Sequence, residues 1–96
     1  MPDYVRVADF QADEAAIDGF LTAVESESGP PEGVPATAIT VLGNRVEEKL
    51  RVVIFFSSED DLRKGSEVLD GMSPPEGANM RRTSVDTFEM LLNRSL

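Results

Sequence analysis

The stretch Leu50-Arg51-Val52-Val53-Ile54-Phe55-Phe56, followed by Ser57-Ser58-Glu59-Asp60-Asp61, decides the fold of this chain. β-branched and aromatic residues dominate the first seven positions, which predicts a strand over 50–56. Each serine has an acidic residue three positions later, the spacing of a capping box, so a helix is predicted over 58–71 with Gly71 as its end. The chain therefore contains a strand that leads directly into a helix.

The preceding half of the chain has the same order of elements. A strand is predicted over 4–10, and a helix over 13–27 with Asp13 as its N-cap. A second strand follows over 36–42, and the polar connection 43–48 joins it to the strand over 50–56. The last strand lies within 79–92 and is centred on 83–90.

A short repeat supports this division into halves. Pro-Pro-Glu-Gly occurs at 30–33 and again at 74–77, each time between a helix and a strand. Two strand-helix-strand units in tandem make the ferredoxin-like βαββαβ arrangement, an α+β fold with an antiparallel four-stranded sheet. Right-handed crossovers place both helices on one face of the sheet. The 96 residues fit one such domain, 1–96.

Composition excludes several kinds of chemistry. The chain has no cysteine and no histidine, which removes thiolate catalysis, the commonest general base and the usual zinc ligands. No phosphate-cradling glycine motif is present. We therefore expect no metal and no cofactor.

Charge and hydropathy restrict the partners. Nine basic and eighteen acidic residues give a net charge of −9, which disfavours both nucleic acid and anionic membranes. The sequence from Met1 to Arg6 has no signal-peptide pattern, and the longest apolar run, 52–56, is too short to span a membrane. We expect a cytoplasmic protein.

The central strands predict a homodimer. A two-layer domain leaves one sheet face bare, and strands on such a face alternate apolar and polar residues. The run 52–56 is apolar on both faces, and the first strand carries Val5 and Val7 on one face and Tyr4, Ala8 and Phe10 on the other. A second subunit would cover the bare face; the alternative is a monomer with this face partly exposed.

Two stretches resemble a known family. Phe55-Phe56-Ser57-Ser58-Glu59-Asp60-Asp61-Leu62-Arg63 is similar to the strand-into-helix segment of antibiotic-biosynthesis-monooxygenase-like members of the dimeric α/β-barrel superfamily. Arg82-Thr83-Ser84-Val85-Asp86-Thr87-Phe88-Glu89-Met90 resembles their last strand. The resemblance implies a dimeric α/β barrel. The family includes cofactor-independent oxygenases, whose catalytic members commonly combine Asn with Trp or His, and this chain has neither Trp nor His.

Candidate ligand-binding residues lie on the first and last strands. If Val5 and Val7 face the helices, Tyr4 and Arg6 face the barrel interior, whereas the pattern leaves the facing of the last strand open. The candidates are Tyr4, Arg6, Arg82, Ser84 and Asp86. Guanidinium groups there would bind a carboxylate or enolate, and Tyr4 or Asp86 would act as acid or base.

The alternative for these residues is structural: Arg6 or Arg82 pairs with Asp86 or Glu89 across the strands. Three functional hypotheses follow. The protein is a dimeric barrel that binds a small organic ligand between sheet and helices, a cofactor-independent monooxygenase that uses Tyr4, Arg6 and Arg82, or a non-catalytic dimerisation or regulatory module.

Overall fold

A computed structural model of the chain describes residues 3–27, 29–72 and 79–96. The elements follow the order β-α-β-β-α-β along the chain. Their bounds are β1 Tyr4–Ala12, α1 Glu14–Ser26, β2 Ala38–Asn44, β3 Lys49–Phe56, α2 Glu59–Asp70 and β4 Met80–Glu89.

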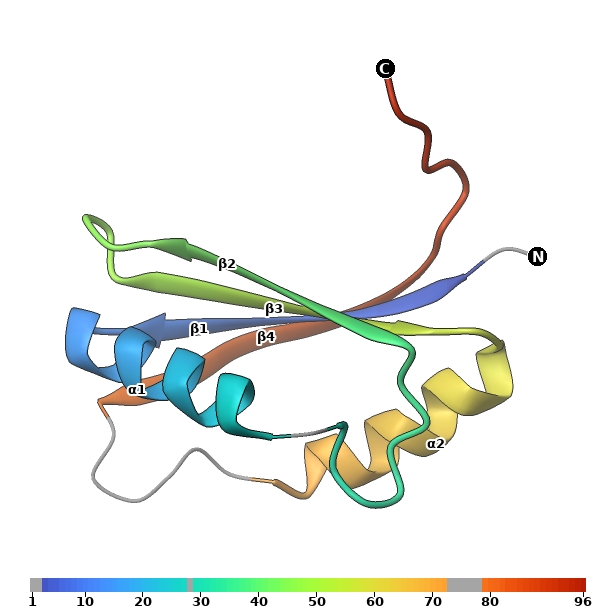
Figure 1. The fold of residues 1–96 in the computed structure, drawn as a ribbon, viewed down its shortest axis with the longest axis horizontal. Coiled ribbons are helices and arrows are strands. Elements are labelled where there is room, and N and C mark those ends of the chain that lie inside the picture. Colours follow the sequence, from blue (N-terminus) through green and yellow to red (C-terminus); the bar gives the residue numbers. More distant parts are fainter. Residues whose placement is uncertain (1–2, 28, 73–78) are drawn as a thin grey trace.

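The four strands form one antiparallel sheet with the order β2-β3-β1-β4. This order, with two helices on one face, is the ferredoxin-like fold, as predicted from the sequence. Figure 1 shows α1 and α2 on the same side of the sheet, while the segment after β4 leaves on the opposite side. The face without helices is called the open face below. On β1 it consists of Val5, Val7, Asp9 and Gln11, and on the other strands of their cross-strand partners.

Asp13 and Gly71 are confirmed as helix caps, and Ser58 is the one of the two serines that caps α2. The Asp13 carboxylate accepts a hydrogen bond from the Ala16 amide at 2.8 Å, and the Ser58 hydroxyl accepts one from the Asp61 amide at 3.1 Å. Gly71 is the C-cap of α2. These contacts satisfy amide groups that have no partner within the first turn of a helix.

Strand ends differ modestly from the prediction. β1 continues to Ala12, two residues beyond the expected end, because it remains paired with β4 as far as Met80. β2 begins at Ala38 rather than at 36. The segment before it turns at Gly33, which has a φ of 84° that suits glycine. The second Pro-Pro-Glu-Gly copy, at 74–77, lies outside the described residues.

The core lies between the sheet and the helices in two adjoining clusters. One contains Ala12, Ala16, Ile17, Leu50 and Val52 beneath α1. The other contains Val34, Phe56 and Leu62 beneath α2. Leu50 and Phe56 are completely buried, so β3 supplies the centre of both clusters.

The two faces of β1 are assigned by these contacts. Phe10 packs against the cluster under α1, Tyr4 packs against the cluster under α2, and Arg6 contacts Asp70 of α2. The even-numbered residues of β1 therefore face the helices. The structure has the reverse of the arrangement considered from the sequence. Tyr4 and Arg6 face the helices, and Val5 and Val7 face away from them. Alternation along a strand then puts Val5 and Val7 on the open face.

Candidate functional site

The predicted site residues divide between the two faces of the sheet. Arg6 is 4% exposed, and its Nη2 donates to Oδ1 of Asp70 at 2.6 Å. Arg82 approaches the same Asp70 oxygen at 3.9 Å. Two guanidinium groups from the sheet thus share one carboxylate at the end of α2, whose last turn contains no basic residue. A cation is favourable at this end of a helix, so the cluster stabilises the packing of α2 on the sheet.

Ser84 and Asp86 lie on the open face, opposite Asp9 and Val7 of β1. The structure therefore does not bring them together with Arg6 and Arg82. Arg51 binds the Asp9 carboxylate through Nε at 2.7 Å and Nη2 at 3.1 Å, and Ser84 Oγ donates to it at 3.2 Å. The hydrogen bond from Arg51, aided by the one from Ser84, holds the pKa of Asp9 below its ordinary value.

A hollow of about 570 Å³ lies at the charged end of the open face. Its charged walls include two ion pairs within the chain, Arg51 with Asp9 at 2.7 Å and Lys49 with Glu47 at 3.0 Å. Sites for organic molecules are lined mainly by apolar side chains, whereas polar and charged residues predominate in the lining of this hollow. The geometry therefore favours another cavity as the candidate site.

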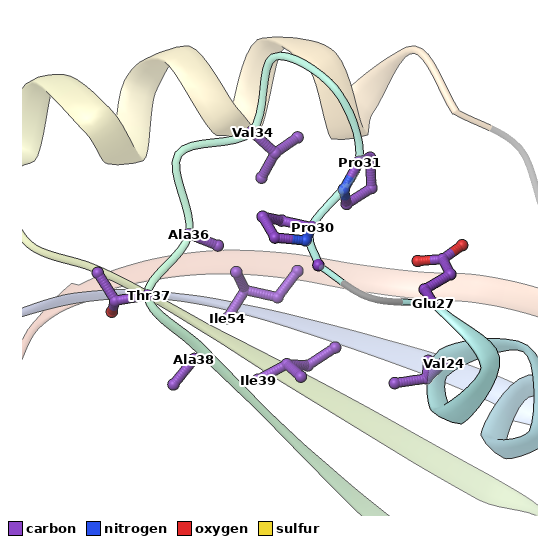
Figure 2. A pocket seen from close by; sticks show the side chains of 11 residues that line it. Val24, Glu27, Pro30, Pro31, Val34, Ala36, Thr37, Ala38, Ile39 and Ile54 are labelled. Atoms are coloured by element: carbon purple, nitrogen blue, oxygen red, sulfur yellow. The ribbon is translucent and has the colours of Figure 1, made fainter.

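That cavity, of about 270 Å³, lies between the end of α1, the segment that leads into β2, and the helix-facing side of β2 and β3 (Figure 2). Its walls are almost entirely apolar. Val24 and Ile39 form one side, and Pro30, Pro31 and Val34 belong to the loop that crosses over it. The remaining lining residues are Glu27, Gly29, Ala36, Thr37, Ala38 and Ile54.

Local structure holds the loop wall in place. Val34 is buried against Phe56 and Leu62, and its amide donates to the Pro31 carbonyl at 3.1 Å. Thr37 donates its amide to the Phe55 carbonyl at 2.8 Å, which fixes the end of the loop to β3. The loop is thus anchored at both the core and the sheet. Ile39, although it lines the cavity, remains 45% exposed, so the cavity has an apolar opening.

Glu27 is the charged residue of this cavity and follows directly after α1. Its backbone amide caps the helix by donating to the Val24 carbonyl at 3.2 Å. Figure 2 draws the Glu27 side chain at the rim, beside the two prolines. The site is therefore an apolar cavity with one carboxylate at its edge.

No three acidic side chains converge in the described part of the chain in a way that would hold a metal ion. None of its helices is both long and apolar enough to cross a membrane.

None of the candidate residues predicted from the sequence lines this cavity. The Pro-Pro-Glu-Gly copy at 30–33 was placed between a helix and a strand, but no chemistry was assigned to it because proline and glycine have no reactive side chains. The one pattern in the sequence that falls on the cavity is the pair of prolines, Pro30 and Pro31, shortly after the predicted helix over 13–27. The cavity forms because α1, this loop, β2 and β3 meet in space.

No family model matches the chain, and no curated protein or solved structure matches it either.

Proposed function

We propose that this protein binds a small, predominantly apolar organic molecule in the cavity between α1, the loop before β2, and the sheet. The observation that carries the proposal is the apolar lining of a cavity whose polar side chains are limited to Glu27 and Thr37. Small-molecule sites in proteins are typically apolar clefts with a few placed polar groups.

The volume restricts the ligand to a small molecule. Ligand pockets commonly enclose roughly 300–1,000 Å³, and this cavity, at about 270 Å³, lies just below that range. A closed apolar cavity of roughly 150 Å³ is enough to bind benzene, and the present cavity is larger but open to solvent on one side. We therefore expect a ligand with one aromatic ring, or an aliphatic body of similar size.

The test is a titration of the ¹⁵N-labelled protein with 2-phenylethanol, a neutral probe. The amide chemical shifts of the protein are measured at each probe concentration. Binding should shift the amides of Ala36 and Ile39, which line the cavity, in a saturable way. The amide of Val46, at the far hairpin, should not move. Saturable shifts confined to the cavity would support the proposal, and their absence in the wild-type protein would overturn it.

A matched pair of variants locates the binding. Ala36→Leu adds three carbon atoms to a half-buried wall position and should abolish the shifts by filling the cavity. Ala23→Leu makes the same change on an exposed position of α1 outside the cavity and should leave them intact. Equal binding by both variants would place the probe elsewhere.

A second property is favoured by the open face: self-association as a homodimer. Phe88 is 53% exposed and Leu42 51% exposed on this face, and Val7, Val53 and Phe55 are only half-buried. Exposed apolar side chains that gather on one sheet face favour a protein partner. A second copy would bring an identical face, as a two-fold dimer requires. The resemblance to the dimeric α/β-barrel superfamily agrees with this proposal and stays a prediction.

The monooxygenase hypothesis required Tyr4, Arg6 and Arg82 around a common pocket. None of these residues lines the proposed cavity, and Arg6 is engaged with Asp70. We therefore place ligand binding ahead of catalysis.

A further inference from the structure

We infer that the bound molecule carries a positive charge, an ammonium group at one end of its apolar body, and that the Glu27 carboxylate receives this group. The inference rests on the proposed ligand-binding function and names the class of ligand: a small apolar amine. Three features of the cavity lead to it.

The first feature is the charge of the lining residues. Glu27 is the only ionisable residue among those that line the cavity. Within the described residues, no arginine or lysine forms an ion pair with it. Arg45, in the connection between β2 and β3, pairs instead with Asp18 at 2.7 Å and with Glu14 at 3.6 Å, in the first half of α1. The Glu27 carboxylate is thus available to a ligand cation, and a charged hydrogen bond is stronger than a neutral one.

The second feature is the end of α1. The helix ends at Ser26, directly before Glu27, and its last turn contains no basic residue. The carboxyl end of a helix carries a partial negative charge that favours a nearby cation. The helix end and the carboxylate therefore act in the same direction, at the same rim of the cavity.

The third feature is the pair of prolines in the wall of the cavity, which offer an anion no backbone N–H. Pro30 and Pro31 form the wall beside Glu27, and proline has no backbone N–H. The net charge of −9 adds a general attraction for cations and repulsion for anions. The cavity is accordingly suited to a neutral body with a cationic end and unsuited to a carboxylate.

The experiment compares three probes of similar shape by amide chemical shift titration: 2-phenylethylammonium, 2-phenylethanol and 3-phenylpropanoate. We expect the ammonium probe to bind about fivefold more tightly than the alcohol, because a partly exposed ion pair typically adds this much affinity. We expect the carboxylate probe to bind most weakly. Added salt should reduce the advantage of the ammonium probe.

Two isosteric variants assign the effect to one carboxylate. Glu27→Gln should bring the affinities of the ammonium probe and the alcohol to about the same value, a ratio of about one in place of about five. Glu25→Gln makes the same charge change on an exposed residue of α1 outside the cavity, and should keep the preference. If the alcohol binds in the cavity but the ammonium probe binds no more tightly, the amine assignment is wrong and ligand binding stands. If none of the three probes binds, the proposed function itself is wrong.

Discussion

Gly65 of α2 lies against the ring of Phe56 at the end of β3. A methyl group built at Gly65 would lie 2.5 Å from Cε1 and 2.7 Å from Cζ of this ring. Phe56 is completely buried, so its ring can give way only by displacing neighbouring core atoms. The absence of a side chain at Gly65 is therefore what allows α2 to approach the sheet.

Replacing this glycine should destabilise the protein. Gly65→Ala forces the helix and the ring apart, and overpacking of this kind lowers the free energy of unfolding by about 1–3 kcal/mol. Gly19→Ala is the control, because a methyl group at Gly19 in α1 would meet no atom within 4 Å. That change should raise stability by about 0.5–1 kcal/mol through the helix preference for alanine. Urea unfolding measures both, and effects of the same sign would contradict this account.

The ion pair of Arg6 with Asp70 should contribute to stability. Asp70→Ala leaves the buried Arg6 guanidinium without its carboxylate, and we expect a loss of about 1–3 kcal/mol in the free energy of unfolding. The control is Asp18→Ala, which removes a pair with the exposed Arg45 and should have little effect. Thermal and urea unfolding of the two variants provide the comparison. A similar small loss in both would show that Arg6 does not depend on Asp70.

Acid should weaken the protein partly through Asp9. Its pKa is lowered in the folded state, mainly by the hydrogen bond from Arg51, relative to the ordinary value of 3.8. A lowered pKa contributes stability that is complete above 3.8 and is lost as the pH falls through the lower folded value.

The corresponding measurement is the urea midpoint over a pH series that descends through this region. Asp9→Asn should make the decline shallower, because the variant has no proton to take up at this position. Arg51→Met should have the same effect on the decline, since it removes the cause of the lowered pKa. If the urea midpoint of both variants falls with pH as steeply as that of the wild type, Asp9 does not contribute to the loss of stability in acid.

Self-association through the open face predicts a concentration-dependent sedimentation coefficient. Phe88→Asp places a charge on the exposed apolar part of this face and should shift the wild-type dimer to monomer. Val46→Asp introduces the same charge at the hairpin, where Val46 is 94% exposed, and should leave the dimer intact. A wild-type protein that sediments as a monomer at every concentration would overturn the dimer proposal.

The cavity is a feature that the sequence pattern does not predict. Its lining comes from α1, the loop at 29–37, β2 and β3, and the residues concerned are ordinary apolar ones. The candidates Tyr4, Arg6 and Arg82 stood out because they are polar within strands. Arg6, however, is buried in an ion pair with a residue 64 positions away, a contact that no local pattern indicates.

The sequence by itself determined the order of the elements, the N-cap of α1 and the end of α2, because capping and strand preference depend on residues within a few positions of one another. Only the tertiary structure decided which face of β1 meets the helices. Val5 and Val7 on one face, and Ala8, Phe10 and Ala12 on the other, are both suited to burial, so alternation alone has two solutions. Packing of Phe10 under α1 and pairing of Arg6 with Asp70 of α2 select one of them.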